Sequence, residues 1–197
     1  MAVSLLREPP LAPPSDLGPY RLRDYEALPD EPRCELIFGR FYLSPSPTPL
    51  HQAIVVFLLQ HLDRTAQANG GLAYGAPLDV VLADHSVVQP DLIYITASRR
   101  RIVQPARIET APDLLVEVLS PGTARRDRGE KLALYARSGV RELWIVDPAE
   151  RQIEFLTNEG DRFAVVLPEG GIFRSPSLPE IALDLVELWR EVAARLP

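Results

Sequence analysis

The chain has 197 residues, which suits a single domain with an ordinary core. Its net charge of −6 argues against sequence-independent binding to nucleic acid, because such binding depends on Lys and Arg neutralising phosphates. A single cysteine, Cys34, excludes an intrachain disulfide and a cysteine-based zinc site.

Neither the apolar runs nor the first residues carry a membrane or targeting signal. The longest apolar run, 53–59, is far too short to cross a bilayer, so we expect no membrane association. Residues 1–6 lack the charged leader and the apolar length of a signal peptide, so a cytoplasmic location is the default expectation. Five prolines in residues 1–19 predict a disordered or loosely attached arm, followed by one domain over 20–197.

The first half of the domain reads as a hairpin, a long helix and several strands. A short helix is expected over 22–28, and residues 33–43 predict a hairpin that turns at Gly39. Apolar residues at helical spacing predict a helix over 51–69, which ends at an Asn-Gly-Gly sequence. Strands are expected over 72–76, 78–82, 87–95 and 114–119.

The second half combines one more helix and strand with a terminal hairpin and helix. A helix over 127–138, closed by Gly139, is followed by a short buried strand over 141–146. A helix that links two strands in this way makes them parallel and implies a mixed sheet. Residues 152–157 and 162–167 predict a hairpin, and an amphipathic helix ends the chain. The predicted fold class is α/β (α+β), a mixed sheet flanked by helices, with an extra N-terminal hairpin and a C-terminal hairpin and helix.

Three acidic residues lie in or beside apolar segments. Asp91 heads the apolar run 92–95, Glu117 interrupts the predicted strand 114–119, and Glu35 opens a strand of the first hairpin. A carboxylate in a buried strand must be paired, protonated or bound to a metal. Hard oxygen ligands suit Mg²⁺ or Mn²⁺, and the lack of thiols argues against zinc. Structural alternatives are a salt bridge for Glu117, a strand-start cap for Asp91 and a water-facing edge position for Glu35.

Lys131 is the only lysine in the chain, against twenty arginines. Arginine does not give up its proton, and its planar fork needs more room than an ammonium group. A single lysine in this background indicates a site that needs a compact ammonium, although a chance survivor on a solvated helix face gives the same pattern. Asp127, Lys131 and Tyr135 recur at every fourth position, so they share one face of the predicted helix.

The order of these motifs resembles a known family. Gln89-Pro90-Asp91 on one strand and Glu117-Val118 on the next are similar to the two acidic motifs of the PD-(D/E)xK nuclease superfamily. More narrowly, the chain resembles a bacterial family of putative restriction endonucleases, which implies a restriction-endonuclease-like core over roughly residues 20–190. In the superfamily's simplest pattern the lysine lies where this chain has Leu119, and Lys131 on the following helix fits its place in this family. The other shared segments are 35–40, 49–51, 118–121, 127–130, Tyr135 and 139–148.

The resemblance implies metal-dependent endonucleolytic hydrolysis of DNA phosphodiester bonds. Asp91 and Glu117, with the backbone carbonyl of Val118, would bind Mg²⁺ or Mn²⁺, and Glu35 would complete the shell directly or through water. Lys131 would position the attacking water or stabilise the charge that grows on the phosphate. Supporting roles are expected for His51, Tyr135 and Asp127.

The resemblance points to DNA as the partner and suggests a homodimer. Two basic runs, Arg99–Arg101 and the Arg125-Arg126-Arg128 set, are expected beside the site, where they could hold phosphates. Two alternatives stay open. One is a catalytically inactive nuclease fold that serves binding or assembly, and the other is a metal-dependent phosphodiesterase acting on RNA or nucleotides, because carboxylate–metal–lysine chemistry does not identify the leaving group.

Overall fold

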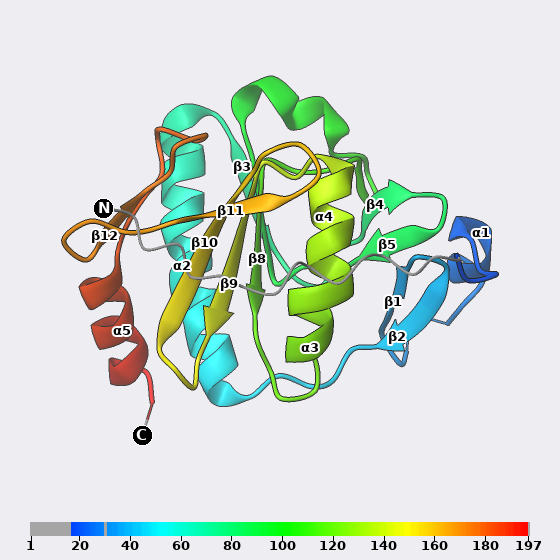
Figure 1. Cartoon of the computed structure of the whole chain (residues 1–197), viewed down its shortest axis with the longest axis horizontal. Coiled ribbons are helices and arrows are strands. Elements are labelled where there is room, and N and C mark those ends of the chain that lie inside the picture. Colours follow the sequence, from blue (N-terminus) through cyan, green and yellow to red (C-terminus); the bar gives the residue numbers. More distant parts are fainter. Residues whose placement is uncertain (1–16, 30, 197) are drawn as a thin grey trace.

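The computed structural model describes residues 17–29 and 31–196, so most of the predicted N-terminal arm lies outside the described residues. The centre of the fold is a six-stranded sheet of order β11-β10-β9-β8-β6-β3 (Figure 1). Its strands are β3 (Leu72–Gly75), β6 (Leu92–Ile95), β8 (Leu114–Val118), β9 (Glu142–Asp147), β10 (Gln152–Asn158) and β11 (Phe163–Val166).

The pairing in this sheet is mixed, as predicted. Strands β8 and β9 run parallel, with Glu117 opposite Ile145, whereas the neighbouring pairs β3–β6, β6–β8, β9–β10 and β10–β11 are antiparallel. The connection from β8 to β9 is helical and ends at Gly139, whose φ of 82° is the left-handed C-cap conformation that glycine favours. The fold class predicted from the sequence is therefore confirmed.

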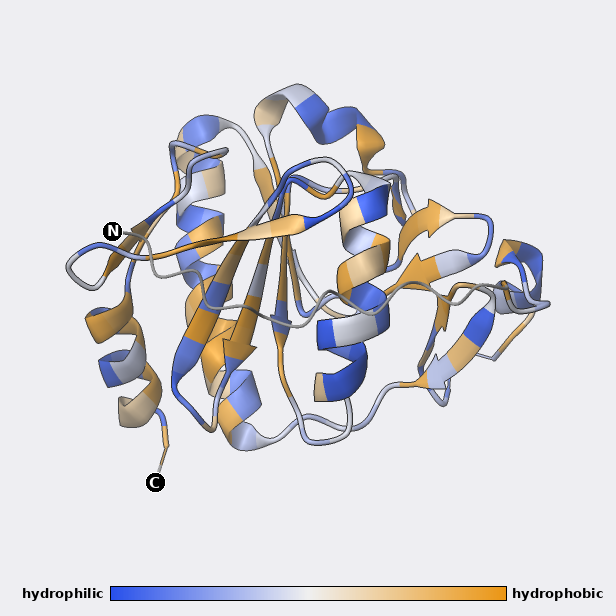
Figure 2. Ribbon diagram, in the orientation of Figure 1, coloured by the Kyte–Doolittle hydropathy of each residue, from blue (hydrophilic) through white to orange (hydrophobic). Residues whose placement is uncertain are grey.

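Helices cover both faces of the central sheet. One face packs against α2 (Pro49–Asn69) and α5 (Leu185–Ala194), with Leu58 and Leu188 fully buried. The other face packs against α4 (Leu132–Ser138), with Leu134 and Tyr135 in a second apolar cluster. Figure 2 shows the apolar strands enclosed between these helices. In the part of the chain that the structure describes, no helix is long and apolar enough to span a membrane.

The helix predicted over 127–138 starts earlier and is irregular. It begins with α3 (Ala124–Arg126), widens into the π-helical turn η2 (Asp127–Lys131) and continues as α4. Such turns, with hydrogen bonds from i to i+5, are rare and occur often at functional sites. Here the turn contains both Asp127 and Lys131 and buries both side chains.

A second sheet, of order β2-β1-β5-β4-β7, lies beside α3 and α4 (Figure 1). The predicted N-terminal hairpin forms part of it, and its two-residue loop is Phe38-Gly39, with φ values of 49° and 75°. Positive φ at both loop residues matches the twist of the flanking strands. Gly18 packs against this turn, and a Cβ atom there would lie 2.1 Å from the carbonyl oxygen of Gly39. The strands are β1 (Cys34–Ile37), β2 (Arg40–Leu43), β4 (Val80–Ala83), β5 (Ser86–Val88) and β7 (Ile108–Glu109).

The single strand predicted over 87–95 was wrong. The chain leaves the second sheet after β5 and enters the central sheet at β6, and the residues between them are Gln89-Pro90-Asp91. Pro90 has no N–H for a ladder hydrogen bond and restricts the residue before it, so the strand breaks there. This break brings Asp91 to the junction between the two sheets.

Three short elements had no clear signal in the sequence. They are the 3₁₀ helix η1 (Ala97–Ile102) after β6, and the strands β12 (Ile172–Arg174) and β13 (Ala182–Asp184), which form a two-stranded sheet before α5. The helix expected over 22–28 is present as α1 (Leu22–Tyr25) and covers only four residues.

Candidate active site

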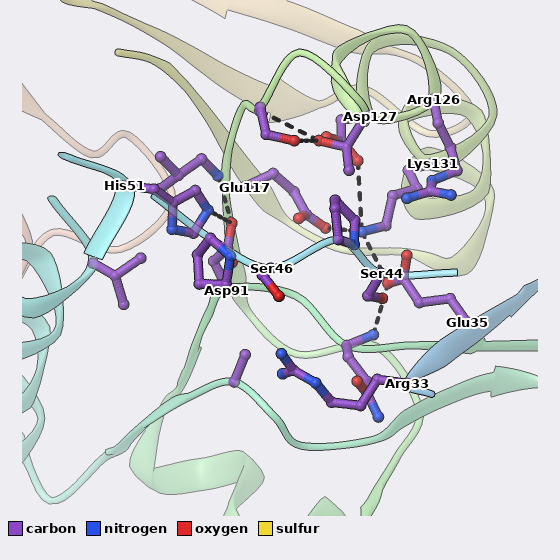
Figure 3. Close-up of a pocket in the computed structure, with 18 of the residues that line it drawn as sticks. Arg33, Glu35, Ser44, Ser46, His51, Asp91, Glu117, Arg126, Asp127 and Lys131 are labelled. Atoms are coloured by element: carbon purple, nitrogen blue, oxygen red, sulfur yellow. Dashed lines mark hydrogen bonds and ion pairs between the residues drawn. The ribbon is translucent and has the colours of Figure 1, made fainter. Parts of the chain in front are cut away.

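A pocket of about 140 Å³ lies where the two sheets meet (Figure 3). Its walls come from β1, the segment between β5 and β6, the end of β8, the start of α2 and the α3–η2 helix. Many of the residues singled out in the sequence line it, namely Glu35, His51, Asp91, Glu117, Val118, Arg126, Asp127 and Lys131.

The ammonium group of Lys131 lies among three carboxylates. Its Nζ is 2.7 Å from Oε1 of Glu117, 2.9 Å from Oε1 of Glu35 and 3.6 Å from Oδ1 of Asp127. The lysine is only 3% exposed, which rules out a solvated position on the helix surface. Lys131, on the helix after β8, therefore forms ion pairs with one residue of β1 and one residue of β8.

The sheet geometry explains why Glu117 faces this lysine. Side chains alternate between the two faces of a strand, and Leu115 and Leu119 belong to the cluster beneath α4. Glu117 has the same parity, so it points toward α4, where it meets Lys131 and accepts a 2.5 Å hydrogen bond from the hydroxyl of Tyr135. Leu119, which occupies the usual lysine position, is buried in that apolar cluster.

Asp91 is fixed by a backbone group and by a histidine. Its Oδ2 accepts a 2.7 Å hydrogen bond from the N–H of Val118, and the same oxygen lies 3.3 Å from Nε2 of His51. His51 stands in the first turn of α2, where its own N–H is capped by the hydroxyl of Thr48. Asp91 is thereby held at the end of β8, next to Glu117.

One oxygen of each key carboxylate is left over. Within residues 17–29 and 31–196, the hydrogen bonds of these two side chains and their ion-pair distances to His51 and Lys131 involve Oδ2 of Asp91 and Oε1 of Glu117, which leaves Oδ1 and Oε2 without a hydrogen bond. The N–H and C=O groups of one strand residue point to the same side. Because the N–H of Val118 is directed at Asp91, its carbonyl faces the same side, beyond the end of β6.

Burial dominates the electrostatics of the pocket. It raises the pKa of Glu117 well above its usual range, although the nearby ammonium of Lys131 opposes the shift. Burial also raises the pKa of Asp127, with the same opposition from Lys131. Burial alone would lower the pKa of Lys131, but Glu117, Glu35 and Asp127 outweigh it and raise that pKa. The lysine therefore keeps its charge at neutral pH.

The donor set fits a hard divalent cation. The four carboxylates of Glu35, Asp91, Glu117 and Asp127 face one ammonium group, so with every carboxylate ionised the cluster has an excess of three negative charges. Oxygen ligands of this kind suit Mg²⁺ or Mn²⁺. In the described part of the chain, no three side chains of His, Cys, Asp or Glu are arranged around one metal position. Asp91 and Glu117 lie beside the backbone carbonyl of Val118, whereas Glu35 is held by Lys131 and by the N–H of Gln89, both through Oε1.

The two basic runs were expected beside the site, and of their arginines only Arg126 lines the pocket. Arg99 donates to Asp113 and to the carbonyl of Ala111, at the end of β8 opposite to Glu117, so Arg99–Arg101 lies away from the pocket. Arg128 pairs instead with Asp147 and Glu154 on β9 and β10. Of the second run only Arg126 lines the pocket.

Sequence reasoning missed several residues of the pocket. Arg33, just before β1, lines it, and so does the Ser44–Pro47 segment that leads from β2 to α2. Nothing in the sequence pattern links either segment to the acidic motifs, because both approach from the second sheet. The contact between Glu35 and Lys131 had no sequence signal either, although a carboxylate in a strand buried throughout its length requires a partner.

Comparisons with known proteins identify a family and a shared fold. Residues 22–186 match the family described as "Putative restriction endonuclease". The crystal structure of a putative nuclease belonging to DUF820 from Anabaena variabilis superposes with a TM-score of 0.74, covering 88% of this chain and 99% of that one at 22% identity. At this identity the likeness shows a shared fold. A comparison with curated proteins found no match.

Proposed function

The chain belongs to the family of putative restriction endonucleases, a nuclease family, and from that premise we propose that it is a Mg²⁺- or Mn²⁺-dependent endonuclease that hydrolyses phosphodiester bonds of DNA. The observation that carries the proposal is the meeting of Asp91, Glu117 and Lys131 in one pocket. These residues come from the segment between β5 and β6, from β8 and from the helix after β8, and each carboxylate keeps one oxygen without a hydrogen bond.

We propose Asp91, Glu117 and the carbonyl of Val118 as the groups that hold the metal. When bound, a divalent ion lowers the pKa of water and polarises a phosphoryl oxygen. The protein holds the ligands in place beforehand: His51 and the N–H of Val118 fix Asp91, and Tyr135 fixes Glu117. Partners of this kind orient metal ligands and raise metal affinity.

Lys131 is proposed to act as a fixed positive charge. Its raised pKa keeps it protonated at neutral pH, so it is suited to stabilise negative charge on the phosphate and unsuited to remove a proton from water. Glu35 and Glu117 orient its ammonium group by direct contact. Asp127, at 3.6 Å, contributes to keeping it charged.

A plasmid cleavage assay tests the proposal. Supercoiled DNA is incubated with the protein in Mg²⁺, Mn²⁺ or EDTA, beside the Asp91→Ala and Lys131→Ala variants. Cleavage in either metal that is absent in EDTA and lost in both variants would support it. A protein without activity in any metal would favour an inactive nuclease fold that serves binding or assembly, and a preference for RNA in the same assay would favour the ribonuclease alternative.

A homodimer and a cytoplasmic location belong to the same proposal. The edge strand β11 of the central sheet supports the dimer, because Val165 on it is 48% exposed and the following Leu167 is 78% exposed. An uncharged, exposed edge of this kind is a ready place for a second chain to pair. Sedimentation measures the oligomeric state of the wild type and of Val165→Lys, and we expect a dimer for the first and a monomer for the second. A wild-type monomer would contradict this part of the proposal.

A further inference from the structure

We infer that Arg33 and Arg126 bind the phosphates on either side of the scissile one, so that the substrate of this pocket is a polynucleotide rather than a small phosphodiester. The inference rests on the proposed function and adds the residues that would distinguish a polynucleotide from a small substrate. It starts from two arginines that line the pocket and are both partly exposed.

Neither arginine has an oxygen acceptor within the described part of the protein. In the described residues, the side chains of Arg33 and Arg126 make no hydrogen bond or ion pair, and Nε of Arg126 is buried without an acceptor. Other arginines in this structure are bound to carboxylates, as Arg128 is to Asp147 and Glu154. A guanidinium group that lines an acidic pocket and has no protein acceptor offers its planar set of donors to a ligand with oxygens.

Arg126 is nevertheless held in place. Its guanidinium carbon lies 5.1 Å from the centre of the Tyr42 ring, a cation–π distance. Burial is the largest cause that raises the pKa of Tyr42 to about 12, and the carboxylate of Glu130, on the same helix as Arg126, adds to it. The ring therefore supports the arginine without neutralising its charge.

The charge of the pocket explains why such residues are needed. The four carboxylates repel a phosphate chain, and Lys131 is fully occupied by three of them. A divalent ion would offset two of the three excess charges at the scissile phosphate, and the neighbouring phosphates would still meet a negative surface. Arg33 and Arg126 are the two arginines among the residues that line the pocket.

Their positions suit a chain of phosphates that passes through the pocket. Arg33 precedes β1 in the second sheet, and Arg126 belongs to α3 beside the central sheet. In Figure 3 they flank the acidic cluster, with Arg33 in the lower part of the view and Arg126 in the upper part. A substrate with a single phosphate reaches Lys131 and the metal ligands without needing either arginine.

The test compares a substrate that has flanking phosphates with one that lacks them. Hydrolysis of a DNA oligonucleotide and of bis(p-nitrophenyl) phosphate is measured for wild type, Arg33→Ala and Arg126→Ala. Two matched controls, Arg125→Ala and Arg137→Ala, remove exposed arginines of the same helix that do not line the pocket. We expect KM for the oligonucleotide to rise about tenfold in the two pocket variants, and kcat/KM for the small substrate to change less than about threefold.

Binding of the oligonucleotide in Ca²⁺, followed by anisotropy at several salt concentrations, gives a second readout. The slope of log affinity against log salt should fall by about one in Arg126→Ala, should stay near the wild-type value in Arg126→Lys, and should not change in Arg125→Ala. Thermal melting confirms that each variant is folded.

Equal losses on both substrates, or a slope for Arg126→Ala that matches Arg125→Ala, would overturn the inference. A wild-type protein that hydrolyses neither substrate would remove the proposed function instead, and the salt slopes would still decide whether these arginines bind phosphates.

Discussion

Asp91 and Val118 are joined by a hydrogen bond that continues the central sheet past its last paired residues. Strands β6 and β8 pair up to Leu92 and Val116, and beyond this point Oδ2 of Asp91 accepts the N–H of Val118 at 2.7 Å. The carboxylate thus takes the place of a backbone acceptor. Because the sheet itself sets its position, Asp91 has both a structural and a proposed metal-binding role, and substitutions can separate the two.

Asp91→Asn should separate them most clearly. The amide keeps an oxygen to accept the N–H of Val118 but loses the negative charge. We expect Asp91→Asn to unfold in urea with a free energy within about 1 kcal/mol of wild type, and Asp91→Ala to lose about 1–3 kcal/mol through the unpaired N–H. Both should lose the rise in melting temperature that Mn²⁺ gives the wild type. A full Mn²⁺ effect in Asp91→Asn would contradict this assignment.

His51→Gln should weaken metal binding without a large effect on folding. The ring lies 3.3 Å from Asp91 and orients it, and loss of such a partner typically lowers metal affinity about 10- to 100-fold. His61 lies further along α2, and its Nε2 hydrogen-bonds with the carbonyl oxygen of Ala182, away from the pocket. His61→Gln is therefore the matched control. Titration of Mn²⁺ by calorimetry measures both. The same affinity in the two variants would show that the His51 ring does not orient Asp91 for metal binding.

Tyr135→Phe removes the hydroxyl that holds Glu117 and keeps the ring in the core. The expected cost is about 1–3 kcal/mol in the free energy of unfolding, because a buried carboxylate oxygen loses a donor. We also expect the cleavage rate to fall. Tyr94→Phe serves as the comparison, since its hydroxyl bonds to Glu180 outside the pocket. Equal cleavage rates in the two variants would mean that Tyr135 supports folding alone.

The pH dependence of stability should reveal the buried Glu117. Its pKa is raised in the folded protein, so between the unfolded pKa near 4.3 and the folded value the native state holds a proton that the unfolded state has lost. The contribution of Glu117 to the free energy of unfolding therefore falls as pH rises, by up to about 1.4 kcal/mol per pH unit. In EDTA, the free energy of unfolding of Glu117→Gln should increase relative to that of the wild type as pH rises from 4 to 8. A difference that stays constant with pH would be inconsistent with the raised pKa.

Local patterns were enough to predict the long helices, the hairpins β1–β2 and β10–β11, and the parallel pair β8–β9. Gly39 and Gly139 ended their elements where expected, because positive φ favours glycine regardless of the surrounding fold. The strand break at Pro90 could also have been read from the missing N–H, but the apolar residues on both sides obscured it. The π-helical turn at 127–131, which buries Asp127 and Lys131, was not predicted from the helical spacing of these residues.

The site was predicted less completely than the fold. Asp91, Glu117 and Lys131 were recognisable because charge in an apolar strand, and one lysine among arginines, both stand out from their surroundings. The direct contact of Glu35 with Lys131, and the approach of Arg33 and Arg126, depend on how the second sheet packs against the first. Such contacts between distant segments leave no periodicity in the sequence, so only the folded structure reveals them.

An anomalous difference map from a crystal of the wild-type protein soaked in Mn²⁺ would test the central claim most directly. The account predicts a peak between Oδ1 of Asp91, Oε2 of Glu117 and the carbonyl oxygen of Val118, with oxygen distances of about 2.0–2.3 Å and Lys131 adjacent. The same soak of Asp91→Ala should show no peak there. A wild-type map without density at this position, or with the ion bound elsewhere, would contradict the account.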